Sequence, residues 1–283
     1  MSLGTAPSTT PPEDGWQACL DLGFEQRAGR TVLARRRRLG PLAVQRSFHP
    51  EGGLCHVYLL HPPGGVVGGD RLDVTVDVAP GAQALITAPG AAKFYRSAGA
   101  VATLEQRLHV APGASLEWLP HENIFFDGAR VAASTRIELP PGARFIGWEM
   151  HCLGRPASRA PFLEGEATAR LEVVRENRPL LLERLQLTPG RMHRPAQLRG
   201  NAVTATVLAA PVDAALRDAV RAAVAVRQDD SVLCAVTVLD DLLALRAIGP
   251  STEQIRRLMV SAWQTMRPVV IGRDPCPPRI WAT

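Results

Sequence analysis

The chain has 283 residues, of which 46% are hydrophobic and 21% charged, a balance typical of a globular protein with a substantial core. Its 24 glycines, 24 prolines and 5% aromatic content favour many short strands over a helical bundle. The formal net charge of +5 suits an acidic partner or nucleic acid without choosing between them, and no run approaches the ~18 apolar residues of a membrane span.

The cysteines and the first residues bear on compartment and domain limits. The five cysteines are an odd number without a C-x-x-C pair, which argues against a disulfide framework or zinc knuckle and favours reduced thiols in the cytoplasm. Residues 1–15 lack the basic and apolar regions of a signal peptide and are predicted to form a disordered tail. We expect a single domain over residues 16–283, β-rich over 16–210 and helix-containing over 211–283.

Strand-like alternation begins at Trp16 and continues through Leu22, and a turn at Gly29 leads to a partner strand from Thr31. Four consecutive arginines, residues 35–38, follow. They suit either a contact with phosphate or an acidic protein, or an edge strand protected by charge. The edge-strand interpretation is favoured because no aromatic residues are interleaved with the charges, as they are on many nucleic-acid surfaces.

The stretch from residue 61 to 96 contains the longest regular pattern. Two glycine pairs between residues 64 and 69 lead to Asp70, and residues 71–78 then alternate strictly between polar and apolar, which predicts a half-buried strand. After Pro80-Gly81, a second apolar run over residues 84–88 is predicted to return as the partner of this strand across the turn.

This unit is repeated twice further along the chain. The segments VAPGAQALITAP, VAPGASLEWLP and LPPGARFIGWE begin at Val78, Val110 and Leu139, so the Pro-Gly turn recurs about every 30 residues. A short unit that cannot bury its own apolar face must stack on its neighbours. The fold class expected is therefore mainly β, with layered, partly β-solenoid-like strands and two α-helices in the C-terminal third.

The last part of the chain changes character. Further strands are expected over residues 167–174, 180–187 and 204–208, and two more over 232–245, interrupted at Asp240. Asp213 can cap a helix that includes Leu216 and Val220. A second helix is predicted to begin at a capping box of Ser251 and Gln254 and to end near Pro268.

Signatures of common enzymes are absent from the sequence. The glycines at 64–69 are followed neither by Lys-Ser/Thr nor by a helix, which excludes a P-loop and a dinucleotide fingerprint. His121-Glu122 lacks the second histidine of a zinc protease, and no G-x-S-x-G is present. Cys152 and His151 are neighbours on a predicted strand, so they should face opposite ways and make a poor catalytic pair.

Three carboxylates are more informative. Glu183 lies on the apolar face of PLLLERLQL, Glu149 shares a face with His151 opposite Trp148, and Asp70 closes the glycine-rich loop. A carboxylate on an apolar face must be paired, hydrated or bound to a cation. One interpretation is buried salt bridges to Arg96, Arg155 or Arg184. The other is a polar, water-filled path or weak metal site lined by the three carboxylates.

Six ordered motifs closely resemble the urease accessory protein UreD family, called UreH in some bacteria. They are HPPGGVVGGD (61–70), TAPGAAKFYRS (87–97), LEWLPHENIFFDGA (116–129), CLGRP (152–156), LLLERLQL (180–187) and PRIWAT (278–283). The resemblance runs from Trp16 to the last residue. The chain departs from the family pattern at Arg71, Ala92 and Arg159-Ala160, which makes a polar channel less acidic at these points.

The resemblance implies a non-enzymatic, cytoplasmic scaffold with a layered β-fold and two helices. Such a protein binds UreF and, through UreF, the nickel-carrying GTPase UreG, and it docks on apo-urease so that nickel and carbon dioxide reach the active site. No cofactor is expected to be bound stably, and nickel would be in transit. A channel would be lined by Asp70, Thr87, Glu149 and Glu183. Auxiliary polar residues would be His151, Lys93, Arg96, Glu122, Asp127 and Arg155.

Other functions and the partner surfaces stay open at this point. A β-solenoid enzyme acting on carbohydrate would need a cleft with two carboxylates, and the low aromatic content argues against it. A nucleic-acid module would rest on Arg35 to Arg38 alone, and neither a nucleic acid nor a membrane is an expected partner. Trp16, Trp281 and the helix near Trp263 are candidate docking positions, and a dimer within the accessory complex is left open.

Overall fold

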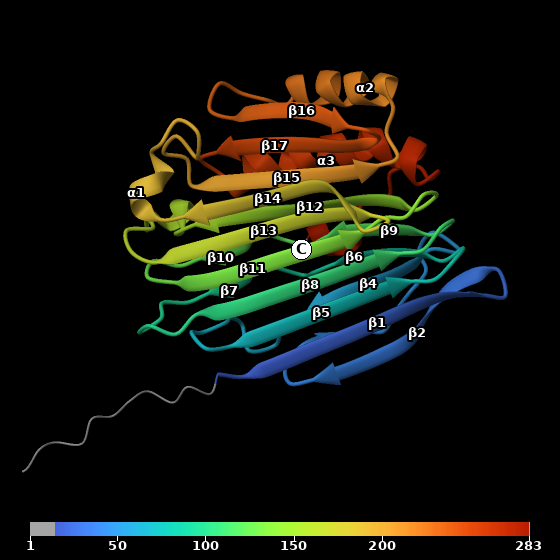
Figure 1. Ribbon diagram of the computed structural model, residues 1–283, viewed down its shortest axis with the longest axis horizontal. Helices are drawn as coiled ribbons and strands as arrows, with labels where there is room; N and C mark the ends of the chain where they lie inside the picture. Colours follow the sequence, from blue (N-terminus) through green and yellow to red (C-terminus); the bar gives the residue numbers. More distant parts are fainter. Residues whose placement is uncertain (1–14, 283) are drawn as a thin grey trace, which may run out of the picture.

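Two β-sheets packed face to face form the body of the molecule in the computed structural model, which describes residues 15–282. The predicted tail over residues 1–15 lies outside the described residues except for Gly15. In Figure 1 the seven-stranded sheet lies in front of the ten-stranded sheet, with α3 behind and α2 beside β16.

The strands are as follows. The seven-stranded sheet has the order β14 (Arg178–Leu187), β13 (Glu166–Arg175), β11 (Arg130–Glu138), β8 (Ala102–Val110), β5 (Arg71–Val78), β1 (Gln17–Arg27) and β2 (Arg30–Leu39). The ten-stranded sheet has the order β16 (Leu233–Leu239), β17 (Leu242–Gly249), β15 (Val203–Ala210), β12 (Arg144–Leu153), β9 (Ser115–Leu119), β6 (Gln83–Thr87), β4 (Cys55–Leu60) and β3 (Ala43–Val44), with β10 (Asn123–Phe125) and β7 (Ala92–Phe94) beside β12. The helices are α1 (Pro189–Met192), α2 (Ala214–Ala225) and α3 (Thr252–Val270), with 3₁₀ turns at Pro156–Ser158 and Arg279–Ala282.

The repeated units stack as parallel coils, which confirms the layered, partly solenoid-like prediction. Strands β5, β8 and β11 pair in parallel in one sheet, and β6, β9 and β12 pair in parallel in the other. At each Pro-Gly turn the chain crosses between sheets, and the turn glycine Gly81 has a φ of +75° that favours glycine. The hairpin predicted for 71–78 and 84–88 is therefore wrong: these runs face each other across the core because both must bury an apolar face.

Two apolar layers result from this arrangement. The first lies between the sheets and is filled by alternate residues of the coils, among them Val76, Leu108 and Trp118. The second lies between the ten-stranded sheet and the two long helices and includes Trp148, Met150 and Trp263. The central strands of the ten-stranded sheet are consequently buried on both faces, so any polar side chain on them needs a partner.

The arginine run lies in β2, at the edge of the seven-stranded sheet, as the charge-protected interpretation predicted. Arg35 pairs with Asp21 at 2.8 Å and also with Asp77, while Arg36, Arg37 and Arg38 are exposed. The run thus protects a free strand edge from pairing with another chain.

The two long helices lie where the sequence predicts them, and one of their two predicted N-terminal caps is present. The Asp213 carboxylate accepts a hydrogen bond from the Leu216 N–H at 2.8 Å, as expected of a cap. The predicted capping box is wrong: Ser251 makes no side-chain cap bond, and Gln254 donates to Asp229 at 2.8 Å. Helix α3 also continues through Pro268 to Val270. Within the described part of the chain, no helix is long and apolar enough to cross a membrane.

Candidate functional site

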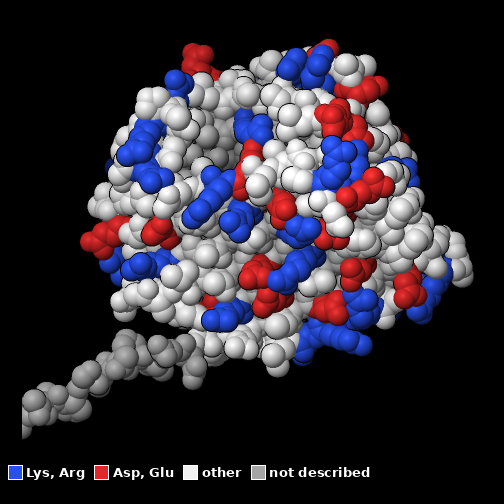
Figure 2. Space-filling model, viewed as in Figure 1, with Lys and Arg blue, Asp and Glu red and all other residues white. Residues whose placement is uncertain are grey.

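A pocket of about 660 Å³ opens where the seven-stranded sheet ends. Strands β13 and β14 form one wall, strands β12, β15, β16 and β17 form the other, and residues 196–199 close one side. Figure 2 shows its mouth as a hollow in the upper part of the face, with both charge signs at the rim. The pocket is thus a gap between the two sheets that apolar side chains do not fill.

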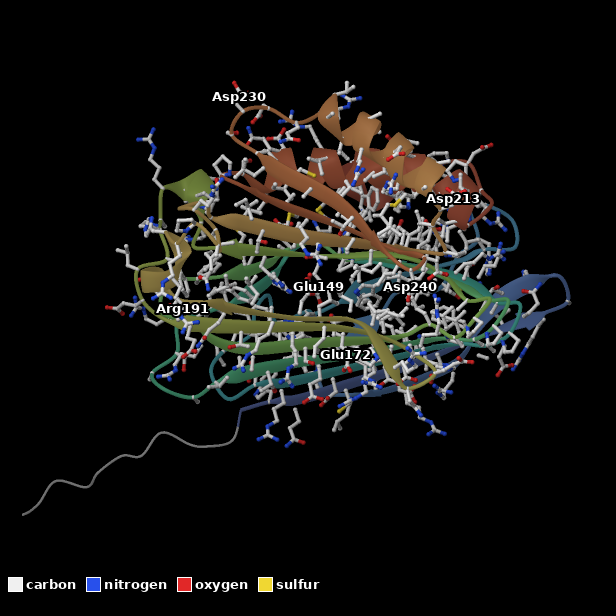
Figure 3. All side chains as sticks on the ribbon, turned by 45° about the horizontal axis from the view of Figure 1, so that its top comes forward. Glu149, Glu172, Arg191, Asp213, Asp230 and Asp240 are labelled. Atoms are coloured by element: carbon white, nitrogen blue, oxygen red, sulfur yellow. The ribbon has the colours of Figure 1, made fainter. Side chains whose placement is uncertain are left out.

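Strand alternation places the charged side chains in this gap. Glu149 and His151 on β12 point into the pocket, while Trp148 and Met150 on the same strand pack toward the helices. Glu183 points inward from β14. Figure 3 shows Glu149 between the sheets, in contrast to Glu172 on the outer face of the seven-stranded sheet. The predicted faces of Glu149, His151 and Glu183 are as expected, and the fold brings these three side chains together.

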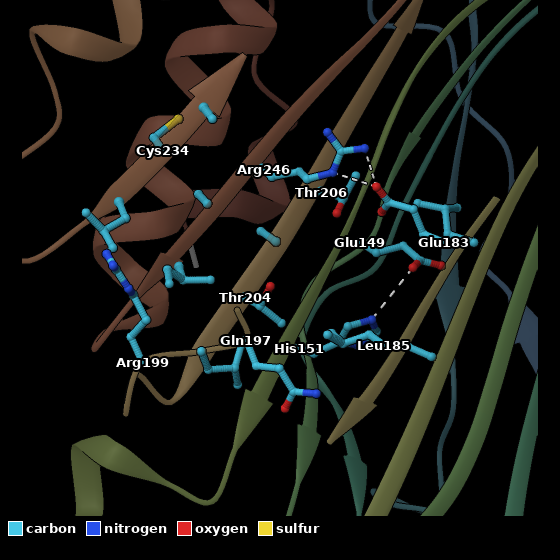
Figure 4. Close-up of a pocket in the computed structure, with 18 of the residues that line it drawn as sticks. Glu149, His151, Glu183, Leu185, Gln197, Arg199, Thr204, Thr206, Cys234 and Arg246 are labelled. Atoms are coloured by element: carbon cyan, nitrogen blue, oxygen red, sulfur yellow. Dashed lines mark hydrogen bonds and ion pairs between the residues drawn. The ribbon is translucent and has the colours of Figure 1, made fainter. Parts of the chain in front are cut away.

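Glu149 and His151 form a buried polar pair. His151 Nε2 lies 3.6 Å from Glu149 Oε2 (Figure 4). The imidazole also stacks on Phe125, with 5.5 Å between ring centroids. Its other nitrogen, Nδ1, lies 3.4 Å from Nδ2 of Asn123 on β10. When Nδ1 is unprotonated it can accept a hydrogen bond from this amide, and the ring proton then lies on Nε2, facing Glu149.

Glu183 is paired with an arginine that sequence analysis did not select. Arg246 Nε on β17 donates to Glu183 Oε1 at 2.5 Å, and a second guanidinium nitrogen completes the ion pair across the pocket (Figure 4). The interpretation that Glu183 pairs with Arg96, Arg155 or Arg184 is therefore wrong. Arg246 was detectable, because it is the single charged residue of the apolar strand LLALRAIG, the same signal that singled out Glu183.

The remaining polar groups of the pocket are mixed. Arg184 and Arg199 are donors, the Thr204 and Thr206 hydroxyls can donate or accept, and Gln197 Oε1 is buried without a hydrogen-bond partner among the described residues. Burial raises the pKa of the Cys234 thiol to about 11, so this residue remains a neutral thiol rather than a thiolate ligand. In residues 15–282, no three His, Cys, Asp or Glu side chains are arranged to hold a metal ion. The lining thus offers oxygen and imidazole groups of the types that borderline divalent cations accept, beside three arginines and without a preformed set of metal ligands.

Polar groups continue from the pocket into the space between the sheets. A small cavity of about 10 Å³, shared by Glu149 and Thr206, is also lined by Thr135 and Trp118. The Trp118 indole Nε1 is buried and has no partner, and Thr135 Oγ1 donates to Gln106 at 2.8 Å. A cavity of this size with several polar groups can hold about one water molecule.

Asp70 and Thr87 do not line this pocket. The Asp70 carboxylate accepts hydrogen bonds from the backbone N–H groups of Trp16 and Val67, both at 2.9 Å, and so holds the glycine-rich loop. Thr87 lies on the helix-covered face of the ten-stranded sheet, where it donates to the Leu119 carbonyl at 2.6 Å and accepts from Trp281 Nε1 at 3.0 Å. Both have local structural roles in this structure.

The other auxiliary residues lie outside the pocket, on loops or, in the case of Lys93, on the short strand β7. Arg96 bridges Asp127 at 2.6 Å and Glu164 at 2.8 Å, and Arg155 stacks over the Phe126 ring at 4.9 Å. Lys93 is exposed.

Glu122 lies beside His121 on a neighbouring loop, at 3.8 Å. Burial alone would raise the pKa of Glu122, but the hydrogen bond with His121 and the nearby Arg256 lower it. Glu122 therefore stays ionised without lining the pocket.

A second charged cluster lies on the opposite face of the ten-stranded sheet and was not predicted. Arg267 of α3 contacts Glu117 at 2.9 Å and Glu51 at 2.7 Å, and Trp263 Nε1 donates to Glu117 at 2.7 Å. Glu51 also contacts His56 at 2.8 Å. Burial alone would raise the pKa of Glu51, but the hydrogen bonds with His56 and Arg267 lower it to about 2. This cluster, Glu51, His56, Glu117 and Arg267, is called the buried network below.

Comparison with known proteins gives one consistent result. A family model described as UreD urease accessory protein matches residues 17–282. A urease accessory protein UreD of Alkalilimnicola ehrlichii is 50% identical over 284 residues, covering 98% of this chain and 95% of the relative. Proteins of the same name are 44% identical in Pseudomonas entomophila, with both chains fully covered, and 45% identical in Klebsiella aerogenes, with 96% of this chain and 99% of the relative covered.

Proposed function

The chain belongs to the UreD family of urease accessory proteins. On that premise we propose that it joins UreF, and through UreF the GTPase UreG, to apo-urease. We propose further that it assists nickel insertion through a polar path between its sheets. Membership of the family supports a role in urease maturation, and in this proposal the chain acts there as an accessory factor without catalysis of its own. We place this work in the cytoplasm, which agrees with five free thiols in the described residues.

The pocket between the two sheets is the observation that carries the nickel proposal. Glu149, His151 and the unpaired Gln197 Oε1 offer one carboxylate, one imidazole and one amide oxygen to the same space. These ligand types accept a borderline divalent cation, and their loose arrangement favours passage over storage. Nickel is the cargo in this account, and it passes with part of its water shell.

The predicted channel residues divide into two groups under this proposal. Glu149 and Glu183 act on the cargo directly, because their carboxylates face the pocket. Asp70 and Thr87 act by holding the loop and the sheet that surround it, because their polar atoms are engaged with backbone and with Trp281.

A carbohydrate-active enzyme receives no support from the pocket lining. None of the described lining residues is a tryptophan, tyrosine or phenylalanine that could stack on a sugar ring. We therefore retain the maturation role alone.

The test compares nickel loading of purified apo-urease by the accessory complex containing wild-type chain, Glu149→Gln or Glu172→Gln. Glu172 is the matched control because it lies on the outer face, paired with Arg136. We expect Glu149→Gln to assemble normally with UreF, UreG and urease but to load nickel several-fold more slowly, and Glu172→Gln to match the wild type.

The scaffold part of the proposal has its own control, in which this chain is left out. Equal urease activation with and without the chain would contradict the scaffold role. Normal loading by Glu149→Gln would remove the path while leaving the scaffold.

A further inference from the structure

The coils meet solvent differently at their two ends. At one end they close in tight Pro-Gly turns. At the other, longer loops precede β5, β8, β11 and β13, at the left of Figure 1. The loop end is defined here as Trp16 and residues 61–70, 88–101, 120–129 and 154–165.

Backbone contacts between successive coils join these loops into one plate. Gly69 N donates to the Val101 carbonyl at 3.3 Å, Ser97 N to Gly128 at 3.0 Å, and Gly128 N to Glu164 at 3.0 Å. A Cβ on Gly165, which has a φ of +100°, would lie 2.4 Å from the Ala129 carbonyl oxygen, so only glycine permits this approach. A surface held in this way is formed before any partner arrives, which lowers the entropic cost of binding.

Exposed apolar side chains are concentrated on this plate. Of the eleven large apolar side chains that are exposed in residues 15–282, five lie here. They are Trp16 at 63% exposure, Val67 at 49%, Tyr95 at 37%, Val101 at 43% and Leu163 at 68%. A concentration of exposed apolar groups on one rigid surface is typical of a protein-binding surface.

Carboxylates at the loop end are already engaged. Asp127 accepts from the backbone N–H groups of Leu163 and Glu164 and pairs with Arg96, which also holds the Glu164 carboxylate. Asp70 accepts two backbone N–H groups, and Glu122 lies beside His121.

Three cations of the same surface have no carboxylate partner in the described residues. They are Lys93, Arg155 and Arg159. The loop end therefore combines apolar anchors with uncompensated positive charge.

We propose that the loop end is a docking surface for an acidic, partly apolar protein face, and that this face belongs to apo-urease, the protein that receives the cargo. The assignment to the receiving protein rests on the proposed function. His151 and Asn123 extend the pocket cluster toward the ends of β12 and β10, where these loops begin. Cargo leaving the pocket on this side reaches the loop end first.

The outer face of the seven-stranded sheet is a poorer docking surface. Central charges on this face are paired in rows: Arg107 with Asp73 and Glu105, and Arg136 with Glu138 and Glu172. Figure 2 shows the two signs interleaved over this face. Such a surface attracts neither an acidic nor a basic partner strongly.

The main test uses the complex of this chain with UreF and UreG, and measures its binding to immobilised, purified apo-urease. Leu163→Asp is compared with Leu182→Asp, because the two leucines are 68% and 67% exposed and only Leu163 lies at the loop end. We expect Leu163→Asp to weaken urease binding at least tenfold and Leu182→Asp to stay within twofold. Trp16→Ala is the second loop-end variant, and thermal melting confirms that each variant is folded.

Salt tests the charge part of the proposal. The double variant Lys93→Glu, Arg159→Glu should associate more slowly and lose most of the salt dependence of the wild type, whereas Arg37→Glu on β2 should behave as the wild type does. Wild-type binding that does not weaken between low and physiological salt would overturn the acidic-partner assignment.

The outcomes separate this proposal from the nickel path. Wild-type urease binding by both Leu163→Asp and Trp16→Ala overturns the docking surface, and so does loss of UreF with urease binding retained. The Glu149→Gln complex should bind urease normally, because Glu149 lies inside the molecule. If Glu149→Gln also loads nickel normally while Leu163→Asp loses urease, the path fails and the docking surface stands.

Discussion

The two charged clusters of this protein lie on opposite faces of the same sheet and differ in how completely their central carboxylates are paired. Glu117 on β9 points toward α3, and Glu149 on the neighbouring β12 points toward the other sheet. Glu117 is bound by Arg267 and Trp263, and no acceptor of its carboxylate is left for another ligand. Glu149 has His151 alone, beside the unpaired Gln197 oxygen.

This difference distinguishes a salt-bridge network that stabilises the fold from a cluster that can still bind a ligand. A buried charge whose partners are all supplied by the chain holds distant segments together, and removing one partner leaves the others unpaired and desolvated. A buried charge left partly unsatisfied beside a cavity retains capacity for water or a cation. The buried network should therefore control stability, and the pocket cluster should control transport with little effect on stability.

The largest effect is expected from Arg267→Met. This change leaves Glu117 and Glu51 buried without their counter-charge, which typically costs about 3–5 kcal/mol of unfolding free energy. Arg136→Met is the matched control, since Arg136 also joins two carboxylates, Glu138 and Glu172, but does so on the exposed face. The control should cost about 1 kcal/mol or less. Denaturant unfolding of both variants measures the difference. Equal losses of unfolding free energy would contradict the contrast between a buried network and a surface ion pair.

Acid should weaken the buried network through Glu51. The pKa of Glu51 is lowered in the folded state from 4.5 to about 2, so the folded protein binds fewer protons than the unfolded chain between these values. Its stabilising contribution, on the order of 3 kcal/mol, is complete above pH 4.5 and is lost as the pH falls toward 2. The difference in unfolding free energy between wild type and Glu51→Gln, measured from pH 7 to pH 3, should therefore shrink as the pH falls. A difference that stays constant would show that Glu51 is not the titrating group.

The sequence was sufficient to predict on which strand faces the pocket carboxylates lie, but not to predict the buried network. Glu149 and Glu183 were detectable because strand alternation placed them on faces whose opposite or neighbouring residues were apolar, and the Pro-Gly repeat predicted stacked coils. Glu117 alternates in the same way in LEWLP, but the sequence did not show that helix α3 covers its face, which could equally have been exposed to solvent. Its partner Arg267 lies 150 residues further along the chain, a distance at which no spacing rule applies.

Local conformation was also harder to predict than periodicity. The turn after β5 was predicted to return the chain within one sheet, although the same residues serve equally well in a crossover between sheets. Arg246 was not predicted as the partner of Glu183 because the two residues lie in different sheets. Each is an unusual charged residue in its own apolar strand, but no sequence pattern connects the two strands.

The smallest effect, and the most direct test of the open cluster, is expected from Arg246→Ala. Arg246 contacts Oε1 of the Glu183 carboxylate through two nitrogens, so its removal should free this oxygen ligand and take one positive charge from the pocket. Because the pair is partly exposed, the unfolding free energy should change by about 1 kcal/mol or less. Weak nickel binding by the complex with UreF should nevertheless tighten several-fold, measured by calorimetry against Arg184→Ala, which removes a pocket-lining arginine without a carboxylate partner. Equal nickel affinity in the two variants would mean that Glu183 does not face the cargo, and that the pocket cluster is as closed as the network behind it.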